Sequence, residues 1–336
     1  MRTTFFLPGE PDLAALARLD PDREPAEFRR GERAWVLQTY LRLRSAGFES
    51  ELDERIPPDG LVLFHSKHEA LVRRGLPARG APVLVGIRAD NREALTAEFE
   101  LVQNGKFAKS GRRIWAPHWP QPGLVARDAS RGASVRRVAY KGFLANLHPA
   151  FHGERWRSFL DRLGVEWVVD ARPFESSTAT DRAALDWSDF SAVDLILAVR
   201  MPDRKTDFSK PATKLVNAWL AGVPALLGKE YAFRELRHTE LDYVEIDPHD
   251  PLVPAERAVE RLAGDPELFR AMVENGRQRA REFDVAAVTS RWIELLGTTL
   301  PALAADSERA RRRRQPLIRR RFRHFVERWR EGRPPR

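Results

Sequence analysis

Two lysines, an asparagine and an arginine are spaced so that they could bind an anion. Lys210 and Lys214 fall one helical turn apart near the start of an expected helix, and Asn217 continues the same face. Free backbone amides and the helix dipole favour phosphate at a helix N-terminus, and the two ammonium groups would add point charges. Arg200 ends the preceding expected strand, and its planar guanidinium suits an anion with several oxygens. The spacing leaves two alternatives open: a phosphate site, or a surface helix with solvated lysines and an arginine paired with a carboxylate.

Two further positions follow expected strands and could take part in chemistry. His65 ends an expected strand over residues 61–64. An imidazole that titrates near neutrality could act as a general base on an acceptor hydroxyl or position a phosphate. Gly142 follows the expected strand over residues 135–140, where the backbone could approach a phosphate with Lys141 beside it. The alternatives are a hydrogen-bonded loop histidine and a plain turn.

Several catalytic and metal-binding signatures are missing. The chain has no cysteine, which excludes disulfides, zinc–thiolate sites and cysteine nucleophiles. No Ser-His-Asp, H-E-x-x-H, Walker-type or G-x-G-x-x-G signature is present, and no D-x-D pair suggests a metal-bound nucleotide sugar. We therefore expect neither a metal site nor a cofactor.

Short apolar runs alternate with amphipathic stretches, which predicts an α/β fold with parallel sheets covered by helices. The expected strands are 3–7, 61–64, 82–87, 99–103, 113–116, 135–140, 165–169, 194–199 and 223–227. The expected helices are 33–46, 154–163, 210–221, 251–263, 266–283 and 285–296. Prolines and glycines between residues 117 and 132 predict a linker. We predict two tandem Rossmann-like domains, 1–125 and 126–300, facing a central cleft, and a helical tail, 301–336.

The run K-L-V-N-A-W-L-A-G-V-P-A-L-L-G-K-E-Y-A-F-R-E-L, which begins at Lys214, resembles the donor-site segment of bacterial GT-B glycosyltransferases. In that family a helix of the type K-L-x-E-A-x-A-x-G-x-P precedes a short strand and a loop with an acidic residue. The resemblance continues through an expected strand at 243–247 and the run D-P-E-L-F-R-A-M-V-E-N-G-R-Q-R-A-R-E-F, and it covers roughly residues 135–296. Retaining members often carry a glutamate pair here, and Ser209 and Asn217 stand at those two positions. The anomeric outcome therefore stays open.

The resemblance implies a glycosyltransferase of the EC 2.4 class whose C-terminal domain holds a nucleotide-sugar donor. The donor-binding residues that it implies are Gly142, Asn146, Arg200, Lys210, Lys214, Asn217 and Glu230. Among these, Gly142 and Asn146 would face the diphosphate, and Glu230 would contact the donor sugar or the ribose. The cationic members and helix amides would neutralise leaving-group charge in place of a divalent ion, so the resemblance implies a metal-independent enzyme.

Residues 307–336 carry all of the chain's excess charge. The formal net charge is +9, and this segment holds thirteen arginines against three glutamates, a net of +10, so the remaining residues sum to −1. Arginines surround one helical stripe made of Ile318, Phe322, Phe325, Val326 and Trp329. Basic amphipathic helices with aromatic residues on the apolar face commonly lie on anionic membranes. The alternatives are a stripe that docks on the protein body and a cation cluster that binds nucleic acid.

The N-terminal apolar run is too short for a signal peptide, and no window has the length of a transmembrane helix. We expect a cytoplasmic enzyme, peripheral on the inner face of the plasma membrane, that meets anionic lipid through residues 307–336 and binds no specific nucleic acid. The predicted function is transfer of a sugar from a nucleotide-activated donor to a glycan or lipid-linked acceptor in bacterial envelope or exopolysaccharide synthesis. The alternatives are a catalytically silent GT-B-like binding protein and a nucleotide-sugar isomerase of the same fold.

Overall fold

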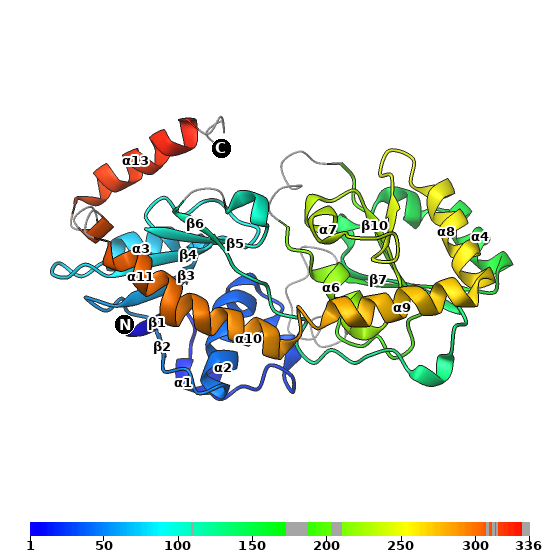
Figure 1. Ribbon diagram of the computed structural model, residues 1–336, viewed down its shortest axis with the longest axis horizontal. Coiled ribbons are helices and arrows are strands. Elements are labelled where there is room, and N and C mark those ends of the chain that lie inside the picture. Colours follow the sequence, from blue (N-terminus) through cyan, green and yellow to red (C-terminus); the bar gives the residue numbers. More distant parts are fainter. Residues whose placement is uncertain are drawn as a thin grey trace. The chain divides into compact units, whose positions relative to one another are not determined.

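The computed structural model contains two compact units (Figure 1). Unit 1 comprises Met1–Pro21, Glu27–Trp119 and Val288–Arg336, and unit 2 comprises Asp22–Ala26 and Pro120–Ala287. The structure describes residues 1–108, 111–172, 187–202, 210–306, 309–310, 313 and 315–330. Ser209, one of the two positions compared with the family's glutamate pair, lies outside the described residues.

Unit 1 is built on a parallel sheet whose described strands have the order β2-β1-β3-β4-β5-β6. Its strands are β1 (Thr3–Phe6), β2 (Glu51–Asp53), β3 (Leu61–His65), β4 (Val83–Ile87), β5 (Phe99–Val102) and β6 (Arg113–Trp115). Every residue of β1, β3, β4 and β5 is buried, as expected for parallel strands covered on both faces. The short apolar runs therefore form the central strands, whereas the partly exposed edge strand β2 was not predicted.

Helices connect these strands and close unit 1. They are α1 (Leu13–Leu16), α2 (Gln38–Ser45), α3 (Glu69–Gly75), α10 (Val285–Glu294), α11 (Leu300–Ala305) and α13 (Leu317–Arg330). The helix predicted over 33–46 forms as a π-helical turn, Arg33–Leu37, that runs directly into α2. Gly47, at a φ of +80°, follows the helix just after its predicted end at residue 46.

Unit 2 holds a second parallel sheet, in the order β11-β10-β9-β7-β8 among the described strands. Its strands are β7 (Arg137–Phe143), β8 (Glu166–Arg172), β9 (Leu195–Ala198), β10 (Ala225–Gly228) and β11 (Val244–Ile246). Its helices are α4 (Glu154–Arg162), α6 (Thr213–Ala221), α7 (Tyr231–Leu236), α8 (Leu252–Gly264) and α9 (Pro266–Ala280). The predicted fold class, α/β with two Rossmann-like domains, is confirmed.

The chain enters the main part of unit 2 just after Trp119, inside the predicted linker, 117–132. Trp119 stays with unit 1 because its indole stacks on Trp292, with 6.5 Å between ring centroids, and its Nε1 donates to Thr39 Oγ1 at 2.8 Å. Trp292 Nε1 donates in turn to the Pro117 carbonyl at 3.1 Å. These contacts place the first residues of the linker in the core of unit 1.

The chain returns to unit 1 after Ala287, inside α10. The predicted domains, 1–125 and 126–300, therefore both end later in the sequence than the units of the structure do. Asp22–Ala26 also belong to unit 2, where Asp22 Oδ1 accepts a hydrogen bond from the Gly123 amide at 2.9 Å. Hydrophobic periodicity indicates that a helix or strand is buried, but it does not indicate in which of the two hydrophobic cores. The domain boundaries could therefore not be predicted from periodicity alone.

Candidate functional site

A cavity of about 260 Å³ lies in unit 2 at the carboxyl ends of β7 and β9. These two strands are neighbours, and the strand order reverses between them, because β8 flanks β7 while β10 and β11 follow β9. In open α/β sheets such a switch point leaves a crevice in which ligands bind. The lining consists of Gln121, Lys141, Gly142, Phe143, Asn146, Trp187, Phe190, Ile196, Leu197, Ala198, Arg200, Lys210, Pro211, Thr213, Lys214, Asn217 and Phe233.

The charged lining of the cavity is cationic. Lys141, Arg200, Lys210 and Lys214 contribute to it, and no carboxylate is among the described lining residues. Of the residues implied by the family resemblance, the structure gathers all except Glu230 around this one cavity. The chemistry of the lining therefore suits an anion.

Lys214 lies at the centre of this cationic group and is fixed in place. Its Nζ donates to the Lys141 carbonyl and lies 4.9 Å from the centroid of the Tyr140 ring. Burial is the main cause that lowers the pKa of Lys214 to about 7; the positive charges of Arg200 and Lys141 act in the same direction, and Glu230 opposes them. Burial removes the water that stabilises the charged form of this lysine. An anion in the cavity would stabilise the ammonium instead, so anion binding would favour the protonated lysine.

Gly142 is required by the close packing around Lys214. Its φ is +152°, and a Cβ at this position would lie 2.9 Å from Lys214 Nζ and 3.0 Å from the Tyr140 hydroxyl oxygen. A side chain here would displace the ammonium or the phenol. The structure thus gives this glycine a steric role in addition to the backbone approach that the sequence suggested.

Arg200 and Glu230 form an ion pair beside the cavity. Arg200 Nε lies 3.4 Å from Glu230 Oε1, and both side chains are largely buried. Arg200 lines the cavity, whereas Glu230, the residue before α7, is not among the lining residues. The ion-pair interpretation of Arg200 is therefore confirmed, and its contact with an anion stays a prediction.

Asn217 replaces a family glutamate and has a clear structural partner. Its Oδ1 accepts a hydrogen bond from the Gln121 backbone amide at 3.0 Å, and both residues line the cavity. The amide oxygen thus holds the segment that enters unit 2 against α6. A neutral side chain does this without placing a negative charge next to the four cations of the lining.

Helix α6 begins at Thr213, one turn later than the sequence analysis predicted. Lys210 precedes Pro211, and the residue before a proline is disfavoured in helical conformation. The prediction that Lys210 and Lys214 share one helix face is therefore wrong, although both line the cavity. Ala212 occupies the cap position and has no side-chain acceptor for the first amides of the helix, and Thr213 in this first turn lines the cavity.

Aromatic side chains form an apolar wall of the cavity; the sequence indicated Trp187 and Phe190, as packing residues or contacts of a nucleobase, but not Phe143 or Phe233. Phe143 packs edge-on against Trp187, with 5.2 Å between ring centroids, and Trp187 Nε1 donates to the Asp170 carbonyl at 3.1 Å. Phe190 and Phe233 complete the aromatic lining. The alternation of side chains along a strand does not indicate which way Phe143 points. Phe143 follows Gly142 at the end of β7, and its direction depends on the backbone conformation of that glycine.

His65 lies in unit 1, at the carboxyl end of β3, and is 1% exposed. Its Nδ1 accepts from the Lys67 amide at 3.3 Å, and Nε2 has no hydrogen-bond partner among the described residues. Burial lowers the pKa of His65 to about 4, against the opposing effect of Glu32. The expectation that this imidazole titrates near neutrality is therefore wrong, because the sequence pattern does not show how completely the ring loses its water.

No protein-family model matches the chain, and no curated protein matches it. Solved structures are similar to it. Sucrose-phosphate synthase from Thermosynechococcus elongatus is 13% identical with a TM-score of 0.51, over 72% of this chain and 74% of that chain. A TarM variant from S. aureus, in complex with fondaparinux, alpha-GlcNAc-glycerol and UDP, is 7% identical with a TM-score of 0.54, over 77% and 59%. HepE from Anabaena, in complex with UDP and glucose, is 13% identical with a TM-score of 0.50, over 89% and 100%.

The chain covers about three fifths of the TarM chain but all of the HepE chain. Identities of this size concern the arrangement of strands and helices, not the chemistry of individual residues. The two parallel Rossmann-like sheets and these similarities together show that the chain has the GT-B glycosyltransferase fold.

Proposed function

We propose that the chain is a glycosyltransferase that holds a nucleotide-sugar donor in the cavity of unit 2 and transfers its sugar to an acceptor. The observation that carries this proposal is the buried Lys214 ammonium beside Gly142, at the strand switch point of a GT-B fold. A diphosphate fits the cationic side of the cavity, and the apolar wall offers a surface for a planar base.

The proposed mechanism uses electrostatic stabilisation of the leaving group. When the bond between the sugar and the diphosphate breaks, negative charge grows on the departing oxygen. Lys214, Lys210 and Arg200 would share that charge with the first amides of α6. Lys214 is already held by the Lys141 carbonyl, so little rearrangement is needed when the charge appears.

His65 stays a candidate catalytic residue in this proposal, with a changed role. A pKa of about 4 makes it a poor base at neutral pH. Because Nδ1 accepts a hydrogen bond, the ring proton lies on Nε2, and the role that we propose is that of a neutral N–H donor instead of a base.

The similar structures support a nucleotide sugar and a hydroxylated acceptor, since TarM is described with UDP and alpha-GlcNAc-glycerol and HepE with UDP and glucose. We place the reaction in bacterial envelope or exopolysaccharide synthesis, at the cytoplasmic face of a membrane that residues 307–336 would contact. Among the described residues, no helix is long and apolar enough to cross a membrane.

The affinity for UDP is expected to fall as the pH rises above about 7. Free Lys214 is neutral above its lowered pKa, whereas the bound diphosphate favours the ammonium, so binding takes up a proton in this range. Below the free pKa the lysine is already charged and adds no pH dependence. Calorimetric titrations with UDP at several pH values would measure how the affinity changes with pH, and Lys214→Met should abolish this dependence. The same pH dependence in the variant would assign the titration to another group.

Turnover is expected to survive treatment with EDTA, because the cationic lining supplies the charge that a divalent ion would otherwise supply. The statement that the chain lacks a D-x-D pair is wrong, because Asp20 and Asp22 form one. In the structure Asp22 Oδ1 accepts a hydrogen bond from the Gly123 amide at 2.9 Å. Across the described ranges, no group of three or more His, Asp or Glu side chains could hold a metal ion. Complete loss of turnover that manganese or magnesium restores would contradict this prediction.

A panel of nucleotide sugars, assayed for release of the nucleoside diphosphate with and without glycan and lipid-linked acceptors, tests the proposed function. Turnover of one donor supports a glycosyltransferase. Binding without turnover would indicate a silent binding protein, and an epimerised nucleotide sugar would indicate an isomerase.

A further inference from the structure

The C-terminal helix α13 presents apolar side chains to solvent. Ile318 is 78% exposed, Phe322 68% and Phe325 42%. Their spacing of four and three residues places them on one helix face, which we call the docking face. The alternative that this stripe packs on the protein body is therefore wrong for these three residues. The side chain of Trp329, which the sequence analysis added to the stripe, lies outside the described residues.

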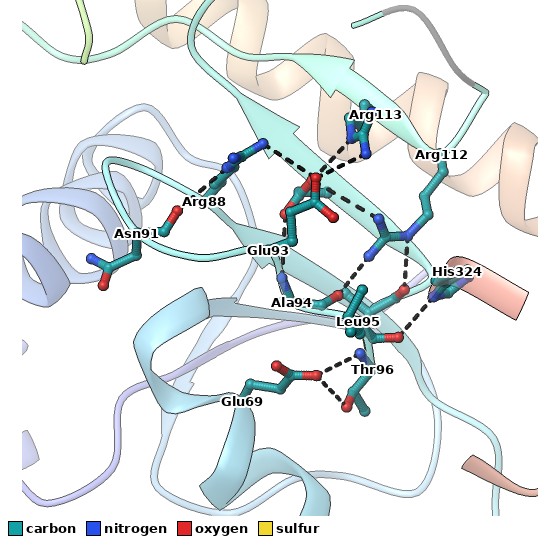
Figure 2. A network of polar contacts seen from close by, with 12 residues as sticks. Glu69, Arg88, Asn91, Glu93, Ala94, Leu95, Thr96, Arg112, Arg113 and His324 are labelled. Carbon is teal, nitrogen blue, oxygen red and sulfur yellow. Dashed lines mark hydrogen bonds and ion pairs between the residues drawn. The ribbon is translucent and has the colours of Figure 1, made fainter. Parts of the chain in front are cut away.

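His324 attaches the other side of α13 to unit 1. Its Nδ1 lies 2.7 Å from the Leu95 carbonyl oxygen (Figure 2). At about 100° per residue, His324 lies roughly 120° around the helix from Ile318 and 160° from Phe322. The contact thus turns the docking face away from unit 1.

Arg313 attaches the segment that leads into α13. Its Nε lies 2.5 Å from Glu98 Oε2 and its Nη2 lies 2.9 Å from Glu98 Oε1, a bidentate pair whose side chains are both largely buried. The same Nη2 donates to the Ala304 carbonyl at 2.8 Å. Two contacts, at Glu98 and at Leu95, therefore hold the tail on one short stretch of unit 1.

That stretch, residues 94–98 between β4 and β5, is itself firmly held. Arg112 Nη2 donates to the Ala94 carbonyl at 2.6 Å (Figure 2). Glu69 Oε1 accepts from both the amide and the hydroxyl of Thr96, each at 2.7 Å (Figure 2). Arg112 and Thr96 are buried, so the attachment point of α13 moves with the sheet of unit 1.

We propose that the docking face of α13, held outward by Arg313 and His324, is a preformed surface for an anionic lipid bilayer. Ile318, Phe322 and Phe325 enter the boundary between headgroups and acyl chains, and the surrounding arginines contact lipid phosphates. The inference rests on the proposed membrane association and names the surface and its attachment. Charge and exposure together favour this occupant: the segment's net charge of +10 attracts an anionic surface, and nucleic acid needs no exposed apolar stripe.

Co-sedimentation of the full-length protein with vesicles tests this surface. We expect binding to equimolar phosphatidylcholine and phosphatidylglycerol and little binding to phosphatidylcholine alone. The double variant Phe322→Ala/Phe325→Ala should bind the anionic vesicles at least about tenfold more weakly, because two exposed rings no longer enter the lipid. Leu71→Ala is the matched control, since Leu71 is an exposed apolar residue of α3, at 38%, and should bind as the wild type does.

Glu98→Gln tests the attachment. The variant removes the negative charge that holds Arg313, so α13 is no longer fixed on unit 1 before it meets the vesicle. Ordering α13 on binding then costs free energy, and we expect the vesicle affinity to fall several-fold. Glu256→Gln, which breaks the ion pair with Arg155 in unit 2, is the matched control. Wild-type vesicle binding by Glu98→Gln would overturn the attachment.

Unchanged vesicle binding by the double phenylalanine variant would overturn the docking face. The proposal would also fail if the wild type bound duplex DNA more tightly than anionic vesicles and the double variant bound the DNA equally well. UDP affinity measured on each variant should equal the wild-type value. Failure of vesicle binding with normal UDP affinity would defeat this inference alone, whereas absent UDP binding in the wild type would defeat the proposed function.

Discussion

Replacing Lys214 with methionine is expected to weaken UDP binding by about 10- to 150-fold, the effect of losing one charge-assisted contact worth about 1.5–3 kcal/mol. Methionine retains most of the buried side-chain volume, so the packing against Tyr140 is largely preserved. The loss should therefore come from the missing ammonium, which lies between the Lys141 carbonyl and the cavity. Calorimetric titration of the folded variant measures the change.

Lys229→Met is the matched control for this experiment. Lys229 is a partly exposed lysine of unit 2 that pairs with Asp247 and does not line the cavity. Its variant should bind UDP as the wild type does. Equal affinities of the Lys214 and Lys229 variants would remove Lys214 from the donor site.

Gly142→Ala is expected to destabilise the protein by about 1–3 kcal/mol, because alanine is strained at a φ of +152°, and to weaken UDP binding by more than tenfold. The added Cβ would stand 2.9 Å from Lys214 Nζ, so the ammonium must leave the position from which it reaches the cavity. Thermal unfolding measures the first effect and UDP titration the second.

Gly132→Ala separates the two effects. Gly132 also has a positive φ, +59°, but a Cβ there would meet no atom within 4 Å. We expect this variant to lose stability while its UDP affinity stays normal. A Gly142 variant that loses stability but binds UDP normally would show that the glycine serves the fold and not the site.

The fold could be predicted from the sequence wherever a local rule decided the structure. Continuous apolar runs marked buried strands such as β3 and β4, since parallel strands covered on both faces need no polar alternation. The predicted end of helix α6 at residue 221 is correct, because Gly222 adopts the left-handed conformation at a φ of +68°. The start of the same helix was misplaced because Pro211 restrains Lys210, a local effect that the helical spacing concealed.

The site could be predicted only as a set of positions near strand ends. Spacing placed Gly142, Arg200 and Lys214 close together, because parallel strands end at the same edge of a sheet. It did not reveal that Lys214 is buried, or that His65 has a pKa of about 4, because both depend on residues distant in sequence that remove water. The partner of Asn217, the Gln121 amide, is equally distant in sequence.

The position of the diphosphate in a crystal structure of the chain with UDP tests the central claim most directly. We predict that both phosphorus atoms lie beside Lys214 Nζ and Gly142, at the first turn of α6, with the base against the wall formed by Phe143 and Trp187. A diphosphate bound elsewhere on the chain, with this cavity empty, would contradict the proposed donor site.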